Sequence, residues 1–454
     1  PPADDHDGAD ARPAGWRRRP STPLMLRVGM ALAVLPVAFF AVAIQLASDR
    51  NHSTLETVGR DATSGITVAQ AIKLNIAELD AIVVQRLLEP TELGSAGFPA
   101  DYNEKREELH DNLVAAASES STGAAYRQPL INIDYALAHY HTLARDAFAA
   151  SRDGDAAQAA QLYAQAHEVA DGTLLAEADF VDKANTYVLN DTYDAQTARA
   201  ASTNRLIVIA TVVLVTFLVL VQLIMARKFR RMLNAALLAA TVLAAGSGAF
   251  ALARLDSSAE SLTNAREQAF DSVHVLARAR ATVVSARQAQ GQFLLAPSSA
   301  PQAIESFNEQ AERVFRVQDG GDVTQLAAAG ETPPGAGGYL ARTVATGVDE
   351  SQEASRAALV AFGGFLEDDA ELREQVSGGD LDGARAAYER GEAYSALAGA
   401  IDDAKDSDQD MFDDHVADAN RAASGVGPLA LGAAAGVLLL VVGGLYLRLR
   451  EYRT

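Results

Sequence analysis

The chain of 454 residues carries a formal net charge of −21 and contains no cysteine. The lack of cysteine excludes disulfides, thiol catalysis and cysteine-based metal sites, and the acidic balance argues against a nucleic-acid-binding protein. Hydrophobic residues make up 49% of the chain but aromatic residues only 6%, and alanine is abundant. This composition favours an all-helical fold over a sheet.

Four apolar runs divide the chain. Each has about twenty residues, and a helix rising about 1.5 Å per residue then crosses a hydrocarbon core of about 30 Å. The first run is long for a secretory signal and no clear cleavage site follows it, so we interpret it as an uncleaved span. The runs predict transmembrane helices over residues 27–47, 205–226, 232–254 and 426–447.

The second and third runs are separated only by the basic segment 227–231, which contains Arg227, Lys228, Arg230 and Arg231. This segment has room only for a tight turn, and cytoplasmic loops are enriched in lysine and arginine. We therefore expect the turn to lie inside the cell. Basic residues also accompany a disordered tail over 1–26 and a short end over 448–454, so both termini are expected on the cytoplasmic side of the plasma membrane.

The polar segments 48–204 and 255–425 are then extracellular, and each reads as two long helices with two shorter ones between them. That order predicts an up-down-up-down four-helix bundle in each segment. The first bundle is expected to use helices over 48–89, 101–118, 125–150 and 156–204, with a possible defect at Asp171 and Gly172.

The second bundle is expected to use helices over 255–296, 302–318, 339–376 and 381–423. A long flexible loop fills 320–338, and Gly363 and Gly364 form a soft spot in the third helix. The predicted fold is therefore an all-α membrane protein with four transmembrane helices and two tandem extracellular bundles.

Short matches between the two polar segments suggest an internal duplication. Leu87 to Pro90 parallels Leu294 to Pro297, and both end a long helix. Gly154 and Asp155 parallel Gly379 and Asp380. Each of these pairs is followed at identical spacing by an alanine and a tyrosine, which are Ala159 and Tyr163 in the first copy and Ala384 and Tyr388 in the second. Both copies begin and end inside, so they are parallel repeats, unlike the inverted repeats of many transporters.

The turns farthest from the membrane are the candidate partner-binding sites. Their residues are Glu89, Leu93, Phe98, Gly154, Asp155, Pro297, Gly379 and Asp380. Leu93 and Phe98 are apolar, and water disfavours them in a loop unless something covers them. Either they contact a partner or they fold back onto their own bundle.

Small residues in the third and fourth spans are candidates for close helix packing in lipid. They are Gly246, Gly248, Gly432 and Gly436. The pattern fits packing between spans of one chain as well as contacts in a homodimer.

No pattern indicates catalysis, a cofactor or a metal. His139 and His141 are two residues apart on a helix, so one ion cannot easily use both. Walker loops, nucleophile elbows and kinase signatures are missing from the sequence. One predicted helix has an acidic face, which is either a solvated surface or a docking stripe for a basic partner. Calcium is a third possibility, but the compact turns with glycine at defined places that calcium loops need are missing. The residues of this face are Asp402, Asp403, Asp406, Asp410, Asp413 and Asp414. We expect a protein that is not an enzyme.

Three stretches carry a resemblance to a known family. Phe270 to His274, Ala277 to Arg280 and Gln292 to Pro297 resemble the first helix of the second ectodomain of GlnX-type membrane proteins of actinobacteria, and the layout is similar over the whole chain. The resemblance implies a relay. An amino-acid-binding lipoprotein would signal outside, and a cytosolic serine/threonine kinase, protein kinase G, would respond inside, directly or indirectly, and adjust nitrogen metabolism.

The sequence thus favours a transmembrane signal transducer whose output passes through another protein, because no cytoplasmic segment is long enough to fold. Two alternatives remain. One is a direct sensor that holds a small molecule between bundle helices. The other is a transporter or scaffold subunit, although the spans are nearly free of the ionisable residues that mark transport pathways.

Overall fold

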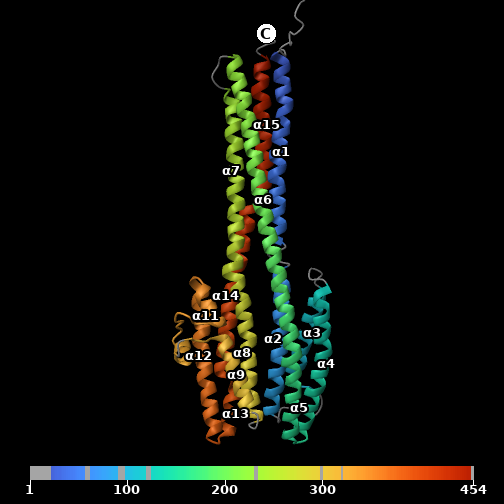
Figure 1. Cartoon of the computed structure of the whole chain (residues 1–454), viewed down its shortest axis with the longest axis vertical. Coiled ribbons are helices and arrows are strands. Elements are labelled where there is room, and N and C mark those ends of the chain that lie inside the picture. The colour runs from blue at the N-terminus through green and yellow to red at the C-terminus, as the bar shows by residue number, and fades with distance from the viewer. Residues whose placement is uncertain are drawn as a thin grey trace, which may run out of the picture. The chain divides into compact units, whose positions relative to one another are not determined.

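The computed structural model describes residues 22–56, 62–89, 98–118, 124–229, 234–296, 300–318 and 321–450. Within these residues the chain is 92% helical and has no strand, which confirms the all-α prediction. The chain divides into two compact units, each drawn in Figure 1. The apolar unit contains the chain up to Asp49, Ala201–Arg254 and the chain from Gly425 onwards, and the polar unit contains Arg50–Ala200 and Leu255–Ser424.

The apolar unit is built from four long helices. They are α1 (Thr22–Glu56), α6 (Ala176–Phe229), α7 (Ala235–Asn264) and α15 (Val426–Arg450), of which α1, α6 and α7 extend beyond the unit. In the part of the chain that the structure describes, four helices are long and apolar enough to cross a membrane. Their outer faces expose large apolar side chains such as Leu35, Val212 and Leu439, as lipid-facing helices do. The chain is therefore consistent with a multi-pass membrane protein.

Two of the four predicted packing glycines lie where helices of this unit meet. A Cβ atom on Gly248 of α7 would lie 2.5 Å from Thr211 Oγ1 of α6, and one on Gly436 of α15 would lie 3.0 Å from Leu243 of α7. Gly246 and Gly432 have no atom within 4 Å of such a position. Gly248 and Gly436 thus serve packing within one chain.

The predicted turn after the second span begins later than the basic residues suggest. Arg227 and Lys228 lie in the last turn of α6, which continues to Phe229. The prediction of a turn from residue 227 was wrong because lysine and arginine are good helix formers and stay helical at a helix end. Arg230 and Arg231 lie outside the described residues.

The first half of the polar unit follows the predicted helices closely. Its elements are α2 (Ala62–Leu88), α3 (Ala100–Ser118), α4 (Ala124–Arg152), α5 (Ala156–Val169), the π-helix η4 (Ala170–Leu175) and the start of α6. The π-helix occupies the predicted defect at Asp171 and Gly172. A core of buried side chains joins these helices and includes Ile76, Tyr102, Phe148 and Leu174.

The second half is more broken than expected. It comprises the π-helix η5 (Ala265–Phe270), α8 (Asp271–Leu295), α9 (Ala300–Val314), α10 (Val323–Ala328), α11 (Tyr339–Thr346), α12 (Asp349–Ser377), α13 (Leu381–Arg390) and α14 (Glu392–Ala423). The expected loop contains α10, and Gly391 in the left-handed region separates α13 from α14. A second core includes Leu276, Phe362 and Ile401.

The predicted soft spot at Gly363 and Gly364 is wrong. Helix α12 runs through both residues. A Cβ atom on Gly363 would lie within van der Waals overlap of the Ala328 backbone at the end of α10. Gly363 therefore lets another helix approach closely, a role that sequence alone does not separate from helix breaking.

The two halves of the polar unit meet along α2 and α8, which lie side by side. A Cβ atom on Gly291 of α8 would lie 2.8 Å from Val84 Cγ1 of α2 and 2.7 Å from the Tyr388 hydroxyl. A shared apolar cluster continues this contact with Leu88 from the first half and Phe293 and Leu294 from the second. The polar unit thus has a core in each half and a tight seam between them.

Candidate functional site

Four of the predicted partner-binding residues form two copies of one local structure. Gly154 and Gly379 have φ of +80° and +87°, which glycine adopts without strain. The next residue caps a helix in each copy. The Asp155 carboxylate accepts a hydrogen bond of 3.0 Å from Gln158 N, and the Asp380 carboxylate accepts one of 2.9 Å from Gly383 N. All four predicted residues are exposed, so the turns combine a capping role with a free surface.

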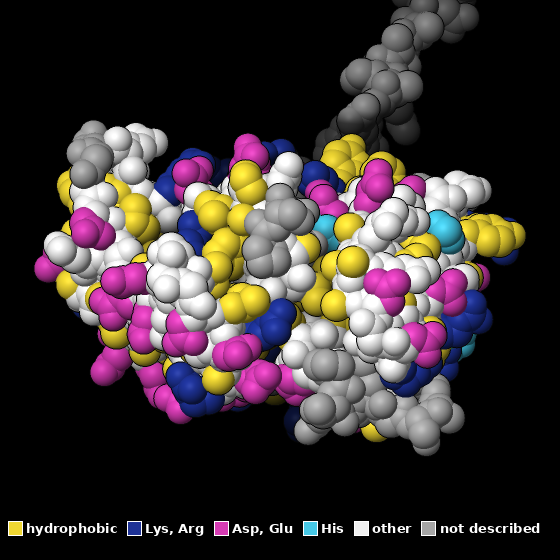
Figure 2. Space-filling view, turned by 90° about the horizontal axis from the view of Figure 1, so that it is seen from below, with side chains coloured by type: hydrophobic (Ala, Val, Ile, Leu, Met, Phe, Trp, Pro, Cys, Tyr) yellow, Lys and Arg dark blue, Asp and Glu magenta, His cyan; other side chains and the backbone are white. Residues whose placement is uncertain are grey.

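The other tip residues are placed differently. Glu89 is half-buried and lies 3.7 Å from Arg86. The Phe98 ring stacks on His141 at 4.0 Å and on Tyr102 at 4.6 Å between ring centroids, so Phe98 folds back onto its own half. Leu93 and Pro297 lie outside the described residues. Figure 2 views the end of the polar unit at which α5 and α13 begin, where many acidic side chains surround smaller hydrophobic areas.

The histidines and the acidic residues considered in the sequence also do not form a common site. His139 is exposed, whereas His141 contacts Phe98 and the Tyr102 hydroxyl, so the two histidines face different ways. On the acidic face of α14, Asp402 is half-buried and pairs with Arg280 at 3.3 Å. The other five members of that face are exposed.

The most prominent polar site is one that we did not single out in the sequence. Asp80 lies on the buried face of α2, one helical turn from both Ile76 and Val84, and is 4% exposed. Its carboxylate accepts hydrogen bonds from the hydroxyl of Tyr140 at 3.0 Å and of Tyr163 at 3.4 Å. His167 Nδ1 donates to the same carboxylate at 2.7 Å. The sequence did offer a signal, which is a single carboxylate among apolar residues at helical spacing. Such a carboxylate is buried with its neighbours, and a buried charge needs partners.

These contacts set the protonation of the groups around Asp80. Burial raises the pKa of both Tyr140 and Tyr163, and the Asp80 carboxylate raises it further. Both hydroxyls therefore remain donors. Burial lowers the pKa of His167, but the Asp80 carboxylate outweighs burial, so the pKa of His167 is raised above its ordinary value.

The Asp80 site extends across the seam into the second half. Gln288 Nε2 on α8 donates a hydrogen bond of 2.6 Å to the Tyr163 hydroxyl, which in turn donates to Asp80. A chain of hydrogen bonds therefore connects α8 with α5 and α2. Such buried networks are stiff when every member is satisfied.

A second buried charge, Arg287, lies on α8 directly before Gln288. Arg287 is 7% exposed and places its guanidinium 3.6 Å from the centroid of the Tyr388 ring. It donates hydrogen bonds to the Tyr388 carbonyl oxygen and, at 3.1 Å, to Gln290 Oε1. Burial raises the pKa of Tyr388 to about 12 although Arg287 opposes the shift. An aromatic face and neutral oxygens thus hold this cation.

The two charges occupy positions that match when the sequences of the two halves are aligned. The offset of 207 residues that relates Leu87 to Leu294 also relates Asp80 to Arg287 and Val84 to Gly291. Val84 and Gly291 meet at the seam, and Asn51 and Ser258, which are 207 residues apart, share a hydrogen bond of 2.9 Å. Equivalent residues that meet one another are typical of two copies packed about a twofold axis.

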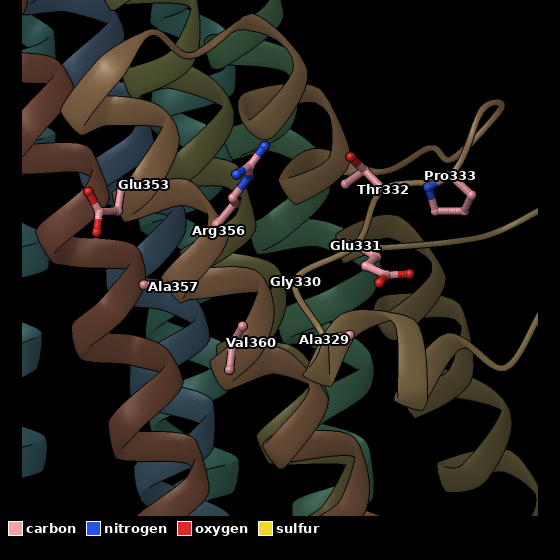
Figure 3. A pocket seen from close by; sticks show the side chains of 9 residues that line it. All are labelled: Ala329, Gly330, Glu331, Thr332, Pro333, Glu353, Arg356, Ala357 and Val360. Atoms are coloured by element: carbon pink, nitrogen blue, oxygen red, sulfur yellow. The ribbon is translucent and has the colours of Figure 1, made fainter.

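One cavity of the polar unit shows no converging chemistry. It has about 750 Å³ and is formed by α12 and the loop after α10. Figure 3 shows Glu353 and Arg356 on α12 and Glu331 on the loop, with their side chains directed apart. Another cavity has about 510 Å³ and is lined by charged residues of both halves.

Comparison with known proteins gives one similarity. Residues 54–194 match the family model described as an actinobacterial sensor domain. No curated protein and no solved structure matches the chain. The matched segment contains nearly all of the first half, from α2 to the early part of α6, including Asp80, Tyr163 and His167. The similarity supports an actinobacterial sensor protein, with its sensor domain in the first half of the polar unit.

Proposed function

We propose that this protein is a non-enzymatic transmembrane signal transducer. Its polar unit, built from two tandem helical bundles, receives an extracellular amino-acid signal from a solute-binding lipoprotein. Its cytoplasmic turn and termini pass the signal to a cytosolic serine/threonine kinase of the protein kinase G type. The sensor-domain similarity of residues 54–194 supports the sensing role, and the resemblance to GlnX-type proteins supplies the two partners.

Helix continuity is the observation that carries the proposal. Helix α6 begins directly after the π-helix η4 and continues without interruption to Phe229, and its C-terminal part contains the candidate span Ala201–Arg227. A shift or rotation of its first turns can therefore pass along one continuous helix. No catalytic group needs to act for such a signal to pass.

The seam between α2 and α8 is where such a motion would exchange buried contacts. The hydrogen-bond chain from Gln288 through Tyr163 to Asp80 is fully paired in this arrangement. A sliding of α8 against α2 would break it, and the buried groups would need new partners. Packed helices with paired polar groups change between discrete arrangements rather than gradually, as a switch requires.

The partner contact is proposed at the exposed capped turns. Asp155 and Asp380 stand in the same local geometry in both halves, so one partner can use them as equivalent contact points. Photocrosslinking residues placed at 155 and 380 in living cells, followed by mass spectrometry, should capture a solute-binding lipoprotein in an amino-acid-dependent manner. The matched control places the crosslinker at Tyr135, which is 74% exposed on α4. Failure to capture a binding protein under any ligand condition contradicts the relay.

Membrane orientation can be tested with the same chain, because it has no native cysteine. Single cysteines replace the exposed residues Asp153 and Arg227. In intact cells a membrane-impermeant maleimide should label the first and should label the second only after permeabilisation. Labelling of residue 227 from outside would remove the basis of the proposal.

A further inference from the structure

A charged cavity between the two halves has no role in the relay just described. It has a volume of about 510 Å³, within the range of small-molecule sites. Helices α2, α6, α8, α9 and α11 and the π-helix η4 contribute to it. Its charged lining residues are Lys73, Asp171, Asp179, Lys183, Arg278 and Arg313.

Cations predominate in this lining, although the chain as a whole has a net charge of −21. The Asp179 carboxylate is shared by two lysines, with Lys73 Nζ at 3.0 Å and Lys183 Nζ at 2.5 Å. Burial raises the pKa of Asp179, but the hydrogen bonds from Lys183 and Lys73 outweigh burial and lower it to about 2. Asp179 therefore stays charged and neutralises only one of its two lysines.

The two arginines have donors to spare. Arg278 binds the buried Asp182 carboxylate through Nε at 3.0 Å and Nη2 at 2.6 Å, which leaves Nη1 for another acceptor. Arg313 is exposed on α9 and donates only to Gln310 Oε1, at 3.4 Å, among the contacts of the described residues. The lining also contains the hydroxyl groups of Thr282, Ser285 and Tyr339. Donors thus exceed acceptors even with the Asp171 carboxylate counted, so the lining suits a molecule that supplies acceptor oxygens.

The volume of the cavity and the placement of its cations on separate helices restrict the class of molecule that it can bind. The cations enter from different helices, with Lys73 on α2, Lys183 on α6 and Arg313 on α9. A cavity of this volume exceeds a single inorganic ion, whereas an organic molecule with carboxylates at both ends can reach several cations at once. Carboxylates pair strongly with arginine and lysine donors.

We propose that this cavity binds a small organic dicarboxylate directly. The site joins the π-helix η4, through Asp171 and Leu175, to α8 and α9 of the second half. π-Helices are frequent at functional sites. A bound dicarboxylate would contact both the start of α6 and the second half of the polar unit. This binding needs no extracellular partner protein.

The test uses the purified full chain in detergent without any partner. Isothermal titration calorimetry is carried out with succinate, with glutamate, which adds an ammonium group, with sodium sulfate, and with putrescine as the cationic control. We expect saturable binding of succinate or glutamate and none of putrescine. A ligand that binds only the folded state also raises the melting temperature, which gives a second readout.

Two exposed side chains allow variants that retain the fold. Arg313→Gln and Lys183→Gln should each weaken dicarboxylate binding about tenfold or more, because each removes a charge-assisted hydrogen bond. The matched control is Arg356→Gln, an exposed arginine beside the other cavity, which should leave the affinity unchanged.

Three outcomes overturn the proposal. They are no saturable binding of either dicarboxylate, binding that survives both cavity variants, and binding of sulfate as tight as that of succinate. None of these outcomes bears on crosslinking to a binding protein, so the cavity and the relay can fail separately.

Discussion

Asp80 and Arg287 stand at equivalent positions of α2 and α8, and yet they solve the problem of a buried charge in opposite ways. The first half surrounds an anion with three donors, from Tyr140, Tyr163 and His167. The second half places a cation on an aromatic ring and gives it neutral oxygens. Helices α2 and α8 thus stand at matching positions of the two halves but surround their buried charges with different chemistry.

The connection to the last helix also differs between the two halves. In the first half, α5 passes through η4 into α6. In the second half, Gly391 with φ of +56° separates α13 from α14. The family model matches only the first half. The comparison indicates that the two halves are not interchangeable, and each prediction below tests one part of that difference.

The largest difference in stability between the two halves is expected when each buried charge is removed. Asp80→Ala leaves two tyrosine hydroxyls and an imidazole without their acceptor, and should lower the free energy of unfolding by ~3 kcal/mol or more. Arg287→Met keeps packing against Tyr388 and should cost ~2 kcal/mol. Thermal unfolding of the purified variants, followed by circular dichroism, measures both. Equal losses of unfolding free energy for the two variants would contradict this expected difference.

The seam is expected to be the next most sensitive feature. Gly291→Ala brings a methyl group against Val84 and the Tyr388 hydroxyl, and overpacking of this kind costs ~1–3 kcal/mol. The control is Gly364→Ala in α12, where no atom lies within 4 Å of the added Cβ and alanine should stabilise the helix by up to ~1 kcal/mol. Calorimetric melting temperatures should therefore move in opposite directions.

A smaller difference in stability is expected between variants of Tyr163 and Tyr388, which occupy matching positions in the two halves. Tyr163→Phe breaks the hydrogen-bond chain from Gln288 to Asp80 and should cost ~1–2 kcal/mol. Among the described residues the Tyr388 hydroxyl donates to the Arg287 carbonyl oxygen alone, at 3.3 Å, so Tyr388→Phe should cost ~0.5–1 kcal/mol. Chemical denaturation of both variants gives the comparison, and a larger loss for Tyr388→Phe would contradict it.

The smallest expected effect is the part of the pH dependence of stability that arises from His167 at the Asp80 site. The pKa of His167 is raised in the folded state above its ordinary value of 6.5. Its contribution to stability is therefore complete below pH 6.5 and is lost as the pH rises through the raised value. The melting-temperature difference between the native chain and His167→Gln should shrink above pH 6.5. The difference for Arg287→Met should stay constant, because arginine keeps its charge throughout.

Much of the helical layout was predictable because it is local. Apolar runs of span length marked the four long apolar helices, and glycine–aspartate turns marked the starts of α5 and α13. The breaks at Gly347 and Gly391 were missed, since a single glycine also occurs inside helices. Gly363 shows the reverse error, because its role depends on Ala328, which is distant in the sequence.

The candidate sites were less predictable for the same reason. The capped turns were visible because cap and turn residues are adjacent. The Asp80 network draws on α2, α4, α5 and α8, and no sequence period brings Tyr140, His167 and Gln288 together. The charged cavity needs α9 and α11 beside α2 and α6. Such sites exist only once helices from both halves have packed.

By itself the sequence determined the helical class, four apolar spans and the repeat of a capped turn, because each depends on residues that are neighbours along the chain. Tertiary structure alone decided the rest. It set Asp80 and Arg287 on either side of one seam, turned Phe98 inward and gathered cations from separate helices around a cavity. The physical reason is that burial and charge pairing depend on contacts across the fold, and those contacts follow the packing of whole helices.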